Sequence, residues 1–180
     1  MAIEDDLVKT SRFVEFCSDN YKTYSVEFAR IILASSSEFD VIAKALCKEI
    51  NPSSDASNID DYRNVILSRY PRFHAMQIDI PRYNFSLKPW DTWNSQVNPT
   101  WWRSYNNVKH QRDLFYCEAT LETSLNSVAG LLCGVLYYFR SILGCHVSLN
   151  PFPQLLETKN VTVFEDSTIS WPFGLPDDEP

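Results

Sequence analysis

Glycine is scarce in this chain of 180 residues: it occurs four times, whereas aromatic residues make up 14% of the sequence. Few glycines and many long apolar side chains favour helices over glycine-rich turns. Hydrophobic residues at 44% and charged residues at 22% exclude a disordered or fibrous chain. A chain of this length suits one domain with a small extension, and it can bury a core without disulfides or metals.

Positive charge is also in short supply. The sequence has 16 Lys and Arg against 23 Asp and Glu, which gives a formal net charge of −7. Phosphate neutralisation needs a basic surface, so the composition excludes a protein that binds nucleic acid through its overall charge. A local basic cluster remains compatible with RNA binding.

The cysteine pattern lacks C-x-x-C pairs, and the number of cysteines is odd. The five are Cys17, Cys47, Cys117, Cys133 and Cys145. Both facts argue against a disulfide framework and against a structural zinc site, so we expect no metal and no cofactor. Residues 1–6 are acidic and lack the basic-then-apolar order of a signal peptide. We therefore expect a cytoplasmic, reducing setting.

The longest uncharged run, residues 123–139, is short for a membrane span. It has 17 residues and includes Asn126, two serines and two glycines. A spanning helix needs about 20 mainly apolar residues. We interpret the run as a buried core helix and expect no membrane association.

Apolar residues recur every three or four positions over several stretches, which predicts a mainly α fold. We expect helices at residues 23–50, 59–69, 99–117 and 121–143, and a shorter helix or irregular arm at 7–21. Asn98 and Pro99 are an N-cap and a first helical residue for the third helix, and Gly144 is a C-cap for the last.

Two stretches are expected to be extended. Residues 76–93 predict one edge strand followed by a loop, and residues 160–171 predict a β-hairpin. The simplest architecture is an up-down helical bundle over residues 1–150, with the hairpin and an acidic tail over residues 151–180 packed on it.

Most enzyme signatures are absent: there is no G-x-G-x-x-G, phosphate loop, H-E-x-x-H or G-x-S-x-G. The informative segment is residues 101–112, WWRSYNNVKHQR. Seven residues make nearly two helical turns, so Arg103 and His110 share one face about 10 Å apart. Arginine supplies a fixed cation for a phosphate, and histidine acts as a general acid or base near neutral pH. These groups suit metal-independent phosphodiester cleavage, although the same pattern also describes a solvated helix face.

Neighbouring residues would support this site. Asn106 and Asn107 lie in the turn between Arg103 and His110, and Asn106 is the candidate that positions them. Further supporting positions are Lys109 and Arg112, which add positive charge, Tyr105 beside Asn106, and Glu38. Glu38 lies at the edge of an apolar stripe, where it either pairs with Arg103 or His110 or is a flanking surface residue.

The segment resembles the HEPN superfamily, whose helical bundles carry an R-x4-6-H motif at the start of a late helix. Arg103 and His110 match that motif with six intervening residues. In the more frequent form, R-N-x3-H, Asn106 and His110 match, and Tyr105 stands at the arginine position. The pattern W-x2-Y-N-x-V-K-H-x-R is similar to uncharacterised bacterial HEPN-like proteins, and the resemblance covers residues 24–139.

The resemblance implies an RNA-directed module that forms a homodimer with the two motifs facing each other. Active members of the superfamily are metal-independent endoribonucleases of defence or toxin–antitoxin systems, in which Arg103, His110 and Asn106 would be the catalytic residues. Other members keep the fold and serve as non-catalytic dimerisation or partner-binding modules. A third interpretation is an antitoxin-like or scaffolding partner of another enzyme.

Overall fold

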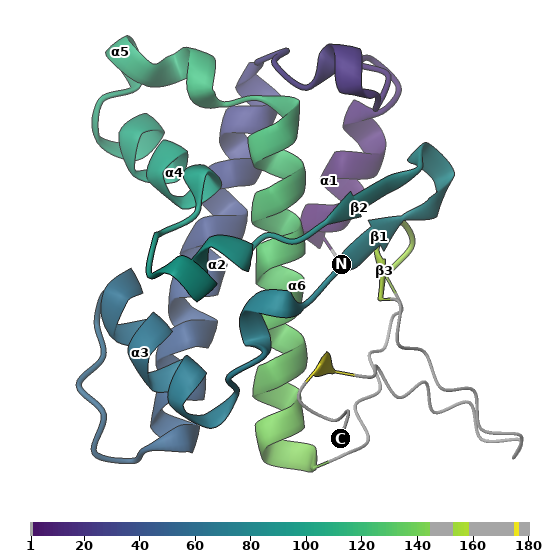
Figure 1. Cartoon of the computed structure of the whole chain (residues 1–180). Helices are drawn as coiled ribbons and strands as arrows, with labels where there is room; N and C mark the ends of the chain where they lie inside the picture. The colour runs from purple at the N-terminus through teal and green to yellow at the C-terminus, as the bar shows by residue number, and fades with distance from the viewer. Residues whose placement is uncertain (1, 145–152, 159–174, 177–180) are drawn as a thin grey trace, which may run out of the picture.

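The chain is mainly helical and carries a small antiparallel sheet at one side of the helices (Figure 1). The computed structural model describes residues 2–144, 153–158 and 175–176. Within them lie six α-helices: α1 (Ala2–Thr10), α2 (Val26–Ile50), α3 (Ile59–Arg69), α4 (Thr100–His110), α5 (Arg112–Phe115) and α6 (Leu121–Leu143). The predicted mainly α class is therefore confirmed.

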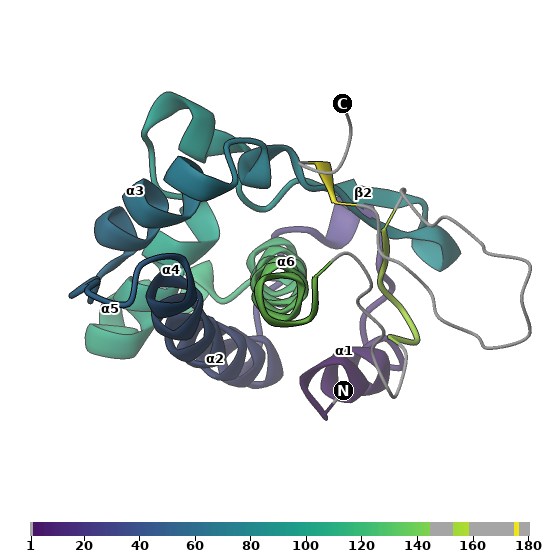
Figure 2. The same ribbon diagram turned by 90° about the horizontal axis from the view of Figure 1, so that it is seen from below.

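The two long helices α2 and α6 run side by side through the centre of the protein, and α1 packs beside them (Figures 1 and 2). Small residues allow the two long helices to approach closely. The hydroxyls of Ser35 and Ser127 hydrogen-bond between them at 2.8 Å. A Cβ on Gly134 would lie 3.0 Å from the Phe39 ring, so glycine lets this ring lie against α6. Helix α6 therefore buries most of its surface.

Helix α6 is also the one helix in the described part of the chain that is long and apolar enough to cross a membrane. In its most apolar window, 61% of the residues are buried inside the protein, as in the core helix of a globular domain. The predicted bounds of this helix, residues 121–143, are confirmed, and so are those of α3.

A cluster of aromatic rings fixes α4 against α2 and α6. The Trp101 indole donates to the carbonyl of Pro89 at 2.8 Å, and the Trp90 indole donates to that of Gly130 at 3.2 Å. The Phe39 ring centroid lies 4.4 Å from that of Trp90. A Cβ on Gly130 would lie 2.7 Å from Trp101, so only glycine admits this ring without a shift.

The helix predicted over residues 99–117 is shorter than expected. Helix α4 ends at His110, and Gln111 leaves helical geometry with φ −142° and ψ 52° before α5 begins. A straight helix to Cys117 would extend α4 by about 10 Å along its axis. The break turns the chain back toward α6 instead. The predicted cap is also wrong: Pro99 is the N-cap, because the Asn98 side chain bonds to α3 residues.

The sheet differs from the prediction in its place and its order. It is antiparallel in the order β2-β1-β3, with β1 (Ile78–Ile80), β2 (Phe85–Leu87) and β3 (Glu157–Thr158). A 3-10 turn at Pro81–Tyr83 joins β1 to β2. The expected edge strand is thus the central one, because residues 157–158 pair with its free side. The hairpin expected at residues 160–171 lies outside the described residues.

Glu4 holds the segment of residues 153–158 against the first helix. Its carboxylate is fully buried, and Oε1 accepts the backbone N–H groups of Leu155 at 2.8 Å and Leu156 at 3.2 Å. Hydrogen bonds to a charged acceptor are stronger than neutral ones, and buried donors need a partner. The N-terminal helix and this late segment are thereby joined across the sequence.

We expect Leu132→Ala to lower the free energy of unfolding by about 2–5 kcal/mol, because large-to-small changes in a packed core remove contacts and leave a cavity. Leu132 is fully buried on α6, as is Leu125. The apolar stripe of α6 predicts the same burial for Val135, which is half-buried instead. Urea denaturation measures the change, and a loss below about 1 kcal/mol would mean a loosely packed stripe.

We expect Glu4→Ala to cost about 1–3 kcal/mol, because it leaves two buried N–H groups without their acceptor. Hydrogen exchange at Leu155 and Leu156 should speed up in the same variant. Asp5→Ala is the matched control, since it removes the same charge from the same helical turn. Equal exchange rates in both variants would show that the carboxylate of Glu4 does not hold the segment.

Candidate functional site on helix α4

Helix α4 divides into a buried face and a polar exposed face. Trp101, Trp102, Ser104, Tyr105 and Val108 are buried against the core. The positions between them face outward because of the 3.6-residue repeat, and they carry Arg103, Lys109 and His110. The apolar face therefore fixes which polar side chains reach solvent.

Arg103 and His110 lie exposed on the same helix, about 10 Å apart along its axis. Neither side chain makes a hydrogen bond or an ion pair with any residue that the structure describes. His110 is the last residue of α4, directly before the break at Gln111. Both side chains are thus available to a ligand.

The two asparagines between them are engaged within the protein. The Asn106 amide donates to the carbonyl of Trp102, one turn earlier, at 2.9 Å. The Asn107 amide donates to both carboxylate oxygens of Glu118, at 3.0 and 3.2 Å. No hydrogen bond joins Asn106 to Arg103 or His110, the residues it is expected to position, in the described part of the chain. Asn107 instead anchors the segment that follows the break.

Tyr105 and Lys109 form a pair one helical turn apart. Lys109 Nζ donates to the Tyr105 hydroxyl at 3.1 Å and lies 5.2 Å from the centre of its ring. Tyr105 is buried, so it does not offer a substitute for the arginine of the R-N-x3-H pattern. Lys109 remains exposed and adds a positive charge beside His110.

Arg103 lines a groove of about 340 Å³ between α4 and the start of α6. We call it the Arg103 groove. Lys22, Ser104, Cys117, Glu118 and Glu122 also line it. Lys22 is 81 positions from Arg103 in the sequence, and no motif or spacing indicated that they share a groove.

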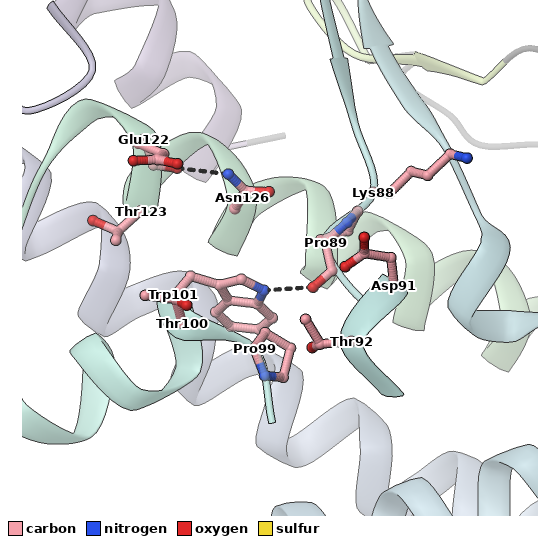
Figure 3. A pocket seen from close by; sticks show the side chains of 10 residues that line it. All are labelled: Lys88, Pro89, Asp91, Thr92, Pro99, Thr100, Trp101, Glu122, Thr123 and Asn126. Carbon is pink, nitrogen blue, oxygen red and sulfur yellow. Dashed lines mark hydrogen bonds between the residues drawn. The ribbon is translucent and has the colours of Figure 1, made fainter. Parts of the chain in front are cut away.

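A second groove adjoins the first and shares Thr100, Glu122 and Thr123 with it (Figure 3). Its volume is about 260 Å³, and the indole of Trp101 lies among its walls. The Trp101 N–H is already bonded to Pro89, as Figure 3 shows. The two grooves together run across the N-terminal ends of α4 and α6.

Glu38 and Arg112 lie in a third groove, of about 620 Å³, between α2 and α5. We call it the α2–α5 groove. Glu38 is exposed, and no hydrogen bond or ion pair joins it to Arg103 or His110 in the described part of the chain. A single copy therefore does not gather all the predicted site residues: Arg103 lies in one groove, and Glu38 and Arg112 in another.

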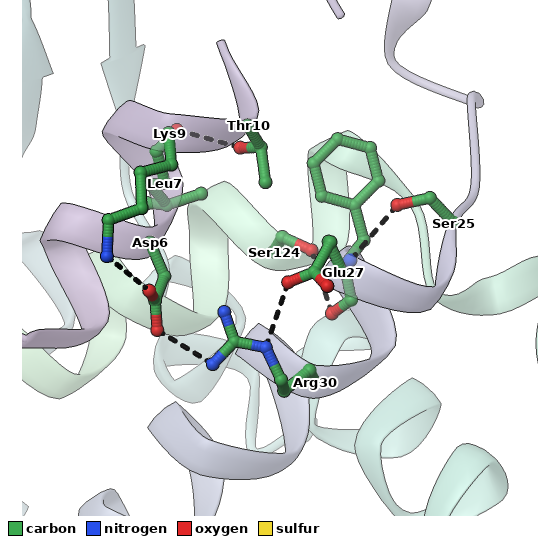
Figure 4. A network of polar contacts seen from close by, with 9 residues as sticks. Asp6, Leu7, Lys9, Thr10, Ser25, Glu27, Arg30 and Ser124 are labelled. Atoms are coloured by element: carbon green, nitrogen blue, oxygen red, sulfur yellow. Dashed lines mark hydrogen bonds and ion pairs between the residues drawn. The ribbon is translucent and has the colours of Figure 1, made fainter. Parts of the chain in front are cut away.

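Arg30 lines the α2–α5 groove, but two carboxylates hold it in place (Figure 4). Its Nη1 lies 2.9 Å from Asp6 Oδ2, and its Nε lies 2.9 Å from Glu27 Oε2. The hydrogen bond from Arg30 lowers the pKa of Asp6 below its ordinary value. This network joins α1 to α2. Arg112, the other arginine in the α2–α5 groove, makes no ion pair with a described residue.

No group of three His, Cys, Asp or Glu residues among those described could hold a metal ion. Cys17, Cys47, Cys117 and Cys133 are free, and burial raises the pKa of the Cys47 thiol to about 11.

Comparison of the chain with protein families, with curated proteins and with solved structures finds no match. The site must therefore be interpreted from its own chemistry.

Proposed function

We propose that the chain is an RNA-directed helical module of HEPN-like type, in which Arg103 and His110 cleave a phosphodiester bond without a metal. One observation supports this proposal above the others. Both side chains are exposed and free of hydrogen bonds and ion pairs to described residues, whereas the polar side chains of Asn106, Asn107 and Lys109 on the same helix are hydrogen-bonded within the protein. An arginine and a histidine left free on one rigid helix suit phosphate binding and proton transfer.

The reaction would use the neighbouring 2′-hydroxyl of the RNA as nucleophile. A neutral His110 takes the proton from this hydroxyl, whose oxygen attacks the phosphorus, and Arg103 balances the charge that develops on the phosphate oxygens. The bond to the 5′-oxygen breaks, and that oxygen needs a proton. One chain has a single histidine on α4, so a second copy is the natural source of the acid.

We therefore propose a homodimer in which the two α4 helices face each other near a two-fold axis. Each site would then combine Arg103 and His110 from both copies. Light scattering at micromolar concentration should give the mass of two chains. A monomer under these conditions would remove the second histidine from the mechanism.

A non-catalytic partner-binding module is the second candidate, and the α2–α5 groove favours it. The groove has an apolar floor that includes Ala29 and Leu33, and Val26 beside it is 70% exposed. Leu114 on α5 is 67% exposed. Exposed apolar surface of this kind commonly marks a protein–protein contact, for example with an antitoxin-like partner. In this case α4 would bind without performing chemistry.

His110→Ala and Arg103→Ala should abolish or strongly reduce cleavage of single-stranded RNA while the protein folds as before. Exposed substitutions usually change stability by less than about 0.5 kcal/mol. His110→Ala should lose more activity, because it removes the group that moves protons. Arg103→Lys should recover part of it, because an ammonium lacks the planar fork of a guanidinium. Gel analysis of labelled RNA and circular dichroism measure the two effects.

Lys48→Ala, which changes an exposed lysine at the far end of α2, is the control for that experiment. Cleavage should persist in the presence of a chelator. An activity that a chelator abolishes and a divalent ion restores would rule out the mechanism. A parent protein that binds a protein partner and cleaves no RNA would favour the partner-binding module.

A further inference from the structure

Lys22 and Arg103 line one groove although they come from separate parts of the chain. Lys22 belongs to the segment that leads into α2, and Arg103 belongs to α4. Both are exposed, and neither side chain makes an ion pair or a hydrogen bond with a residue that the structure describes. The groove thus carries two cations that no described residue neutralises directly.

Backbone pairing holds Lys22 in this position. Residues 21–25 run antiparallel to residues 119–122, with a bridge between Tyr24 and Thr120. The N–H of Glu122 donates to the carbonyl of Tyr21 at 3.1 Å, and that of Leu121 donates to the carbonyl of Thr23 at 2.9 Å. Lys22 lies between these two bonded positions. Its backbone is therefore placed before any ligand arrives, which lowers the entropy lost on binding.

We propose that the Arg103 groove holds a backbone phosphate of a single RNA strand and that Lys22 is a second phosphate-binding residue beside Arg103. This inference rests on the proposed function, and it names a residue that the α4 motif does not contain. A guanidinium binds a phosphate through two parallel N–H groups, and an ammonium adds a point charge from the other wall. The volume of about 340 Å³ is within the range of small-ligand sites.

Two carboxylates also line the groove, and they differ in whether a described residue holds them by a hydrogen bond. Both oxygens of Glu118 accept from the Asn107 amide, so this side chain is held toward α4. Glu122 is exposed, and its charge raises the pKa of Tyr21 in addition to the effect of burial. Glu122 therefore opposes a phosphate in the groove. Its removal should strengthen binding, whereas removal of Lys22 should weaken it.

The test measures binding of a fluorescent, single-stranded 2′-O-methyl RNA, which has no free 2′-hydroxyl and stays intact. The salt slope is the change in the logarithm of the binding constant with the logarithm of the salt concentration. One phosphate contact on a single strand contributes about 0.7 to this slope, which corresponds to about fourfold in affinity at 0.15 M salt. We expect Lys22→Ala to weaken binding by about fourfold and to lower the salt slope. Glu122→Gln should tighten binding by a similar factor. Lys48→Ala, about 33 Å away along α2 from Val26, should leave it unchanged.

Cys117 provides a second measurement, because this exposed thiol lines the same groove. Bound RNA should slow the alkylation of Cys117, as measured by mass spectrometry of its peptide. Cys17, which is partly exposed and lies outside the groove, should react at the same rate with and without RNA. In the Lys22→Ala variant the protection should appear only at higher RNA concentration.

The outcomes separate this inference from the proposed function. If Arg103→Ala weakens binding while Lys22→Ala and Glu122→Gln behave as the parent, the groove assignment is wrong and the α4 site remains. If the parent binds no RNA, the proposed function itself fails. If RNA binds and Cys117 stays unprotected, the strand lies elsewhere and the inference is overturned.

Discussion

The close contact between α2 and α6 is the constraint on which the other elements depend. Serine and glycine residues let the two helices approach. The buried Ser35 hydroxyl donates to that of Ser127, which donates in turn to the carbonyl of Ser124. The Ser124 hydroxyl bonds within α6 and reaches the carbonyl of Phe28 on α2. A larger side chain in this seam would separate the helices and displace the aromatic rings packed against both.

The start of α6 follows from that contact. Thr120 and Thr123 cap the helix reciprocally, which fixes its first turn and leaves residues 119–122 in position to pair with residues 21–25. The connection from α4 must end at this point, so the chain breaks at Gln111 and the Glu118 carboxylate meets the Asn107 amide on its return. The first turn of α4, with Arg103, thus lines a groove whose opposite wall is part of the same capped region.

Local sequence signals predicted the bounds of α3 and α6, whereas α1 lies at Ala2–Thr10 instead of within residues 7–21, α2 begins at Val26 instead of residue 23, and α4 ends at His110 instead of residue 117. The apolar stripe and the Gly144 stop gave the bounds of α6 correctly, and the predicted bounds of α3 also match. The same rules misplaced the cap of α4, because Asn98 is used by Arg63 and Asp60 across the fold. The spacing of Arg103 and His110 indicated two free side chains on α4. The bond of Asn106 to the carbonyl four residues earlier is a local contact that asparagine commonly makes in helices. That Glu38 lies in a different groove could not be predicted from the spacing, because long-range packing decides it.

The polar side chains of α4 fall into two groups, those that hydrogen-bond within the protein and those that do not. Side chains that stabilise the helix and its return, such as Asn106 and Asn107, have their hydrogen bonds within the protein, whereas Arg103 and His110 do not. Substituting the engaged asparagines would change folding and function together, so a loss of activity in such variants would say little about mechanism. Arg103 and His110 can be changed without loss of a described contact. The distinction between a catalytic face and a binding face therefore rests on these two residues, whose chemistry is separable from the stability of the helix that carries them.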